Sequence, residues 1–116
     1  MKSLARIRKR NGRCYELAAR AMLYEPDSDQ FTLVHGSAAH PDHGGRRLNH
    51  AWIELDDGRT IYEPVTDSRQ PAAYLAATYQ LLVDHRYSRQ EACALMSATR
   101  NYGPWTEAER AAEKKQ

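Results

Sequence analysis

The sequence has few of the features that mark secreted, membrane or repetitive proteins. Only two of its 116 residues are cysteine, Cys14 and Cys93, too few for a disulfide scaffold, so free thiols in a reducing compartment are expected. No apolar run approaches the roughly 18 residues that a membrane-spanning helix needs. The N-terminus is basic and has no apolar stretch of the kind that a secretory signal carries. These absences predict a cytoplasmic protein without membrane association.

The charge is nearly balanced, with 17 basic and 15 acidic residues and a net charge of +2. Residues 1–13 are the exception, because they carry basic side chains and no acidic one. This segment lacks interleaved aromatic residues and the rest of the chain is near neutral, so a nucleic-acid partner is not expected. A solvated face, or a segment that covers acidic surface on a partner, explains the charge equally well. The length predicts one domain over 1–105, followed by a charged tail over 106–116.

The hydrophobic pattern changes from helical to strand-like and back to helical. Asp57-Gly58 is a strong hairpin signal, and Ser88 with Glu91 matches a capping box at a helix start. The order predicts an α+β fold, in which an antiparallel sheet packs against an N-terminal helix and C-terminal helices. The expected elements are a helix over 13–24, a strand over 31–36, a loop over 37–46, strands over 48–55 and 59–63, and helices over 71–84 and from 88 to about 102.

Cys14 lies in the first turn of the first expected helix. The unpaired N–H groups and partial positive charge of a helix N-terminus favour thiolate over thiol and can stabilise an oxyanion. Arg13 adds positive charge nearby. Asn11 is expected to cap the helix, and its amide is an alternative oxyanion donor. Taken alone, Cys14 is also compatible with an ordinary buried residue, and Cys93 is expected to be structural.

His50 acquires a carboxylate neighbour through the register of the hairpin. With Asp57-Gly58 as a two-residue turn, Trp52 lies opposite Glu63, and Glu63 is the diagonal neighbour of His50 on the same sheet face. Diagonal Cβ atoms lie roughly 7 Å apart, which a glutamate side chain can bridge. Glu63 can therefore hold the imidazole, or instead be a solvated hairpin residue.

Two further residues lie near His50 in this register. Asp67 is its other diagonal neighbour and ranks second, because Pro64 is expected to end the strand before it. Trp52 shares the His50 face, where it forms core or the wall of a pocket.

Three short motifs follow one another over residues 11–67. They are Gly12-x-Cys14-Tyr15-Glu16-x-Ala18, Asn49-His50-Ala51-Trp52-Ile53-Glu54, and Asp57-Gly58 followed by Ile61-Tyr62-Glu63-Pro64. In this order they resemble the transglutaminase-like branch of the papain-like cysteine peptidase superfamily. The resemblance implies a papain-like core with Cys14 as nucleophile, His50 as base and Glu63 as the orienting acid. The sequence departs from the family in having Glu where Asp is usual.

That resemblance implies a small thiol hydrolase or acyltransferase acting on a peptide or amide bond of a protein or peptide substrate. The C-terminal motifs, Tyr87-Ser88-x-x-Glu91-Ala92 and Asn101-Tyr102-Gly103-Pro104-Trp105, are also similar to small phage and mobile-element proteins. The alternative is therefore a phage-type protein that binds and blocks a host protein on an idle scaffold.

Metal binding is the remaining hypothesis for the histidines. His35, His40, His43 and His50 fall near one loop that also holds Asp42, but their spacing matches no familiar zinc pattern. No metal and no cofactor are expected.

Overall fold

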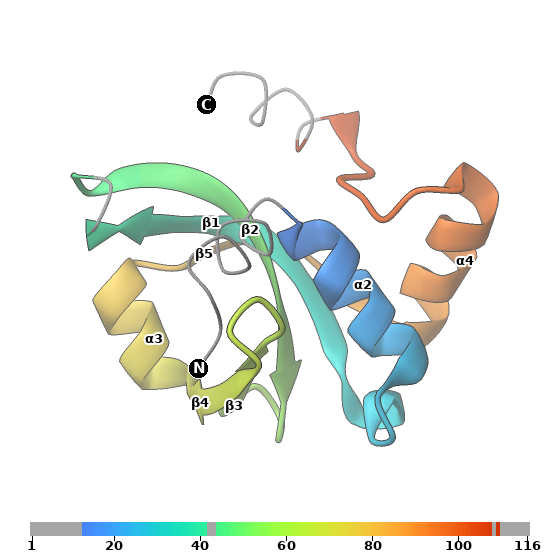
Figure 1. The fold of residues 1–116 in the computed structure, drawn as a ribbon, viewed down its shortest axis with the longest axis horizontal. Helices are drawn as coiled ribbons and strands as arrows, with labels where there is room; N and C mark the ends of the chain where they lie inside the picture. The colour runs from blue at the N-terminus through green and yellow to red at the C-terminus, as the bar shows by residue number, and fades with distance from the viewer. Residues whose placement is uncertain (1–12, 42–43, 108, 110–116) are drawn as a thin grey trace.

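The computed structural model describes residues 13–41, 44–107 and 109. Its five strands form one antiparallel sheet in the order β4-β3-β2-β1-β5, which confirms the predicted α+β class (Figure 1). No helix in this part of the chain has the length and apolar character to cross a membrane. The elements are α2 (Cys14–Tyr24), the 3-10 helix η1 (Ser28–Gln30), β1 (Thr32–His40), β2 (Arg46–Leu55), β3 (Thr60–Glu63), β4 (Ser68–Pro71), α3 (Ala72–Tyr79), β5 (Leu82–Ser88) and α4 (Arg89–Thr99).

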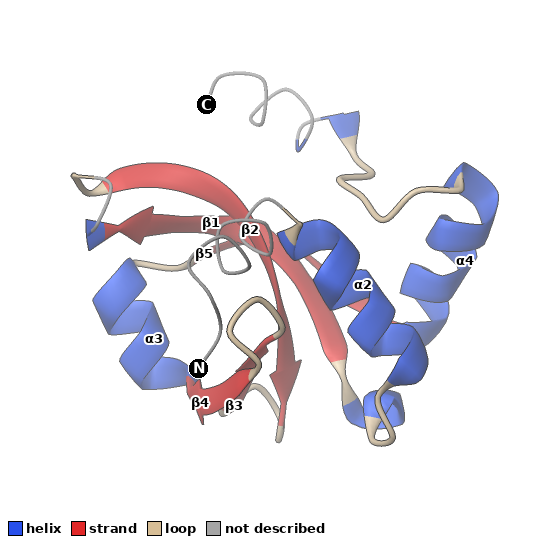
Figure 2. Ribbon diagram, in the orientation of Figure 1, coloured by secondary structure: helices blue, strands red, loops and turns tan. Residues whose placement is uncertain are grey.

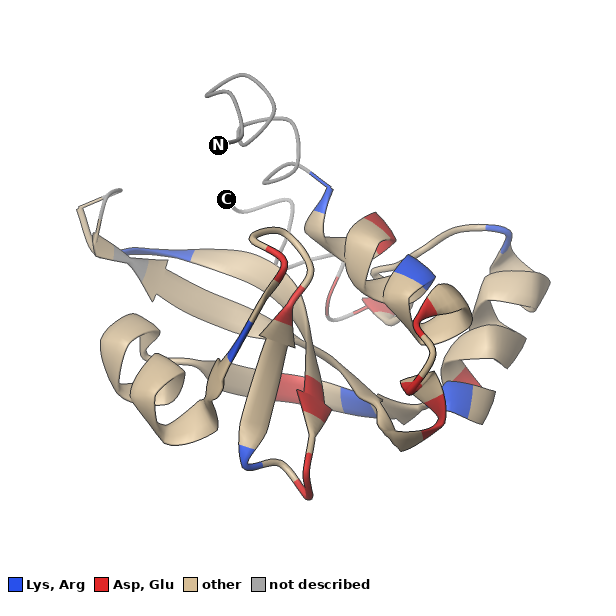
Figure 3. Cartoon of the chain, turned by 60° about the horizontal axis from the view of Figure 1, so that its bottom comes forward, with Lys and Arg blue, Asp and Glu red and all other residues tan. Residues whose placement is uncertain are grey.

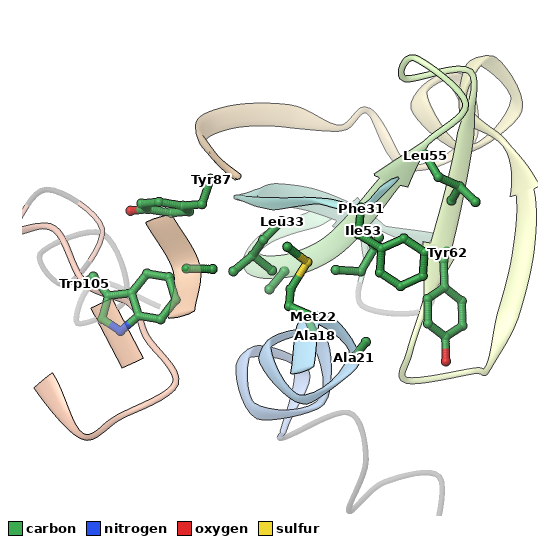
Figure 4. Close-up of a cluster of buried hydrophobic side chains, with 12 residues drawn as sticks. Ala18, Ala21, Met22, Phe31, Leu33, Ile53, Leu55, Tyr62, Tyr87 and Trp105 are labelled. Carbon is green, nitrogen blue, oxygen red and sulfur yellow. The ribbon is translucent and has the colours of Figure 1, made fainter. Parts of the chain in front are cut away.

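Helices cover both faces of the sheet, with α2 and α4 on one side and α3 on the other (Figure 2). The larger core lies under α2 and α4, where Met22 packs against Leu33 and Ile53 (Figure 4). Across the sheet, Trp52 packs with Val34, Ile61 and Leu75. Successive side chains of a strand point to opposite faces, so the side chains of β2 pack alternately into the two cores.

The hairpin of β2 and β3 has the register that the sequence predicts. Ile53 pairs with Tyr62 and Leu55 with Thr60. The turn is two residues longer than predicted, covering 56–59, with left-handed backbone at Asp56, Asp57 and Gly58. β2 ends at Leu55 as expected and β3 begins one residue later than expected, at Thr60. Asp56 and Arg59 are simply left unpaired, so the pairing of the other residues is unchanged and Glu63 stays on the His50 face.

Half of the residues in the loop expected over 37–46 are in strands. β1 continues to His40 and β2 already begins at Arg46, paired from Ser37↔Asn49 to His40↔Arg46. The expectation was wrong because these residues gain their hydrogen bonds from a partner strand, which overrides the local preference of a polar, glycine-rich stretch for a loop.

The helix expected over 71–84 was also wrong in its second half. α3 ends at Tyr79, Gln80 takes a left-handed conformation, and β5 follows as an edge strand paired with β1. β4 was not predicted either. The capping box at Ser88 and Glu91 is confirmed, with reciprocal bonds of 3.1 and 3.0 Å.

Gly36 lies where β1, β5 and the Trp52 core meet. A Cβ at this position would overlap the carbonyl oxygen of Leu82 and lie 2.8 Å from Cη2 of Trp52. We therefore expect Gly36→Ala to lower the free energy of unfolding by about 2 kcal/mol, the scale of overpacking in a core. Urea unfolding followed by tryptophan fluorescence measures this change.

Gly45→Ala is the control, because Gly45 has a φ of +75° but no neighbouring atom within 4 Å of the added Cβ. Only the backbone penalty, about 1 kcal/mol, is expected there. An equal loss in both variants would contradict the close packing at Gly36.

Candidate active site

Cys14 is the first residue of α2, and its side chain is buried. The first helical hydrogen bond runs from the N–H of Leu17 to the carbonyl of Arg13, at 2.9 Å. The N–H groups of the first turn therefore have no carbonyl partner within the helix. Arg13 occupies the N-cap position and makes no side-chain cap. Asn11, which was expected to cap the helix, lies outside the described residues.

His50 and Glu63 meet across the hairpin as the register predicts. Nε2 of His50 lies 2.8 Å from one carboxylate oxygen of Glu63 and 3.1 Å from the other. Their side chains are 14% and 16% exposed. The imidazole also stacks on Trp52, with ring centroids 5.9 Å apart. The ring is thus held by a carboxylate at its edge and by an indole at its face.

The third member of the group is Cys14. Burial by itself lowers the pKa of His50, but hydrogen bonding and electrostatic interaction with the side chains of Cys14 and Glu63 outweigh burial and raise that pKa from 6.5 to about 10. His50 therefore stands between the sulfur and the carboxylate, and its ring is the cationic member of the group at neutral pH.

The other residues singled out by the sequence lie around this group in different roles. The guanidinium of Arg13 is bound to Glu16, with Nε 3.0 Å from Oε1, so its charge is compensated there. Asp67 accepts a hydrogen bond from the hydroxyl of Tyr62 at 3.0 Å, and the carboxylate on His50 is Glu63. Trp52 is buried in the core and forms the wall behind His50.

The described part of the chain also has a groove with a volume of about 350 Å³, which Cys14, His50 and Glu63 themselves do not line. One wall is α2 and the other is the turn between β3 and β4. Leu17, one helical turn after Cys14, and Pro64, which follows Glu63, both line it. The groove is partly apolar and has room for a side chain of a peptide. Its lining residues are Leu17, Arg20, Ala21, Tyr24, Glu25, Tyr62, Pro64 and Asp67.

The sequence did not suggest a second buried pair, His35 and Glu109. Nδ1 of His35 lies 3.2 Å from Oε1 of Glu109, and the two side chains are 1% and 4% exposed. The available signal was Thr106-x-x-Glu109, a capping-box spacing. Thr106 and Glu109 do bond reciprocally, at 3.0 and 3.1 Å.

The charge of Glu109 is strongly favoured in the folded protein. Burial by itself raises its pKa, but hydrogen bonds from His35 and from the N–H groups of Thr106 and Trp105 outweigh burial and lower it from 4.5 to about 2. Because the folded pKa is the lower one, this stabilisation is present above about pH 4.5 and is lost as the pH falls through about 2.

Of the histidines considered for a metal site, only His35 and His50 have described side chains, and these two bind different glutamates. His35 binds Glu109 while His50 binds Glu63. The side chain of His40, and the residues Asp42 and His43, lie outside the described part of the chain. Within that part, no group of three or more His, Cys, Asp or Glu side chains could hold a metal ion.

Basic and acidic residues are interspersed over the described part of the chain (Figure 3). Several pair with one another, as Arg86 does with Glu54 and Arg69 with Asp27. Of the basic segment 1–13, only Arg13 is described.

Comparisons of the chain with protein-family models, with curated proteins and with solved structures give no match.

The raised pKa of His50 can be tested by removing the charge of Glu63. We expect Glu63→Gln to lower the pKa of His50 from about 10, because an amide cannot stabilise the imidazolium as a carboxylate does. Imidazole NMR titration measures the change. Since the folded pKa is raised, the stabilisation from His50 charge is complete below about pH 6.5 and is lost as the pH rises through about 10.

Glu54→Gln is the matched control. Glu54 lies on the same strand and face as His50, but its carboxylate pairs with Arg86 at 2.8 Å. Equal titration of His50 in Glu63→Gln and in the parent would contradict the assigned cause.

Proposed function

We propose that this protein is a small thiol enzyme that attacks the carbonyl of a peptide or amide bond, using a papain-like or transglutaminase-like arrangement of Cys14, His50 and Glu63. The supporting observation is that one imidazole, that of His50, hydrogen-bonds to both the Cys14 sulfur and the Glu63 carboxylate. A nucleophile, a base and a group that orients the base are the parts that covalent catalysis at a carbonyl requires.

The reaction follows from the protonation states of the group. The Cys14 thiolate adds to the substrate carbonyl carbon, and the N–H groups at the start of α2 stabilise the oxyanion that forms. His50 gives its proton to the leaving nitrogen as the C–N bond breaks, which leaves a thioester on Cys14. Water or an amine then attacks the thioester, His50 takes up the proton, and the thiolate leaves. Water gives a carboxylic acid and an amine gives a new amide.

Glu63 acts through His50. Its carboxylate occupies Nε2 of the ring, which leaves Nδ1 as the nitrogen for the sulfur and for proton transfer. The contact with both carboxylate oxygens and the stacking on Trp52 restrict rotation of the ring. A glutamate can therefore serve where the related enzymes mostly have aspartate, because its extra methylene spans the diagonal of the hairpin.

The substrate class that fits is a protein or peptide. The groove between α2 and the β3–β4 turn has apolar walls from Leu17, which lies one helical turn after Cys14, and from Tyr62 and Pro64, which flank Glu63 in the sequence. A side chain flanking the attacked bond can lie there while the carbonyl faces the start of α2.

The reactivity of Cys14 is the first test. We expect iodoacetamide to alkylate Cys14 at about pH 5–6, where an ordinary thiol, which ionises around pH 8.5, is still protonated. Cys93, partly exposed in α4, is the internal control. Peptide mass spectrometry across the pH range gives both rates. His50→Ala should slow Cys14 at low pH and leave Cys93 unchanged.

A Cys14 that reacts only in parallel with Cys93 would remove the basis of the enzyme proposal. The chain would then be better explained as a binding protein on an idle scaffold, and isolation of partners by affinity capture would follow.

Acyl transfer is tested with a small activated ester. With p-nitrophenyl acetate, we expect a burst of p-nitrophenolate close to one equivalent of protein, because acylation of a thiolate precedes slower deacylation. Cys14→Ser should abolish the burst and Cys93→Ser should retain it. Added glycinamide accelerates turnover if the enzyme transfers to amines, whereas a rate independent of glycinamide indicates hydrolysis. A burst that survives in Cys14→Ser would contradict the assigned nucleophile.

A further inference from the structure

The segment that follows α4 turns back over the end of the molecule where α2 begins (Figure 1). It is anchored there by Glu109. One carboxylate oxygen of Glu109 binds Nδ1 of His35, and the other accepts the N–H groups of Trp105 and Thr106 at 3.1 and 3.0 Å. Three donors therefore converge on the buried carboxylate of Glu109. This favours its ionised form, because a buried charge is stable only when its hydrogen bonds are satisfied.

This anchor contacts the start of α2 through aromatic packing. The ring of His35 meets the edge of Tyr15, the residue next to Cys14, with centroids 4.8 Å apart. Trp105 lies on another side of the same imidazole, at 5.1 Å. Gly103 lies so close that a Cβ there would come within 2.8 Å of Cε1 of His35 and 3.5 Å of the Tyr15 ring.

The same anchor contacts β2. The side-chain amide of Asn49, the residue next to His50, donates to the backbone carbonyl of Glu109 at 3.3 Å. The sequence neighbours of Cys14 and His50 are therefore both connected to Glu109. Tyr15 packs on the His35 ring that Glu109 binds, and Asn49 bonds to Glu109 directly. His35, which lies on β1, pairs across the sheet with Ala51 of β2.

We infer that Glu109 is a positioning residue for the Cys14–His50 pair: by binding His35 and Asn49 it holds the 101–109 segment against the start of α2 and against β2. This inference rests on the proposed function. Cys14 and His50 are carried by different elements, a helix and a strand, and their separation depends on how those two elements are held together. The segment tied by Glu109 touches both elements close to the reacting atoms.

The charge of Glu109 is what the anchor requires. An amide in its place has one oxygen and one NH₂ group, so it cannot accept from His35, Trp105 and Thr106 together. At least one buried donor then loses its partner, and the segment is expected to shift. The shift would reach Cys14 through Tyr15 and His50 through Asn49.

The test compares Glu109→Gln with Glu107→Gln in the full chain. Glu107 is an exposed glutamate in the same segment, so its replacement makes the same charge change without touching the anchor. We expect Glu109→Gln to reduce the ratio of Cys14 to Cys93 alkylation at about pH 6 about tenfold, within the range expected when a reacting group is misplaced. The pKa of His50, followed by NMR, should fall as its contact with the sulfur loosens. Glu107→Gln should match the parent in both.

A fall in stability alone would not move the titration of His50, so the two readouts separate positioning from folding. Unchanged alkylation ratio and unchanged His50 titration in a folded Glu109→Gln would overturn the inference while leaving the proposed function intact. A parent chain whose Cys14 reacts like Cys93 would instead overturn the proposed function and the inference with it.

Should Glu109→Gln fail to fold, Asn49→Ala decides the question, because it removes the partly buried bond from the Asn49 amide to the Glu109 carbonyl. Arg47→Ala is its control on the same strand, where the guanidinium of Arg47 donates to the hydroxyl of Ser37 at 2.9 Å. The inference requires a lower Cys14 to Cys93 ratio in Asn49→Ala than in Arg47→Ala. Equal ratios would overturn it.

Discussion

The register of the hairpin between β2 and β3 is the constraint on which the candidate site depends. Ile53 opposite Tyr62 places His50 and Glu63 on one face, two positions apart along the diagonal. A shift of one residue would turn Glu63 to the other face and leave the imidazole without its carboxylate. The turn over 56–59 is longer than the shortest possible one, yet it preserves this pairing because Asp56 and Arg59 are both left out of the ladder.

The site also depends on how charge is accommodated away from water. Cys14, His50 and Glu63 are largely buried, and a lone charge there would be strongly disfavoured. Because the imidazole of His50 interacts with the Cys14 side chain and with the Glu63 carboxylate, its charged form is favoured despite burial, and its pKa rises to about 10. The same logic applies to His35 and Glu109, where a carboxylate with three donors stays ionised. Both pairs couple a strand histidine to a glutamate, and His50 also interacts with the Cys14 side chain.

Local sequence patterns predicted the first helix, the hairpin and the capping box at Ser88, because each of these depends on residues close together in the sequence. They failed for β5 and for the far half of β1, whose extended conformation is stabilised by pairing with distant strands. They also failed for Glu109, because its partner His35 lies 74 residues away in sequence. Edge strands and buried ion pairs of this kind depend on tertiary contacts that no local pattern reports.

The sequence by itself determined that Cys14 starts a helix and that His50 and Glu63 share a face of one hairpin, since helix termini and strand alternation follow from local backbone geometry. Only the tertiary structure decided that the helix brings Cys14 to that histidine, and that the chain beyond α4 returns to bind His35. Both contacts join segments that lie far apart in the chain. They form because helices pack on both faces of the sheet, and the burial of apolar surface outweighs the entropic cost of closing long loops.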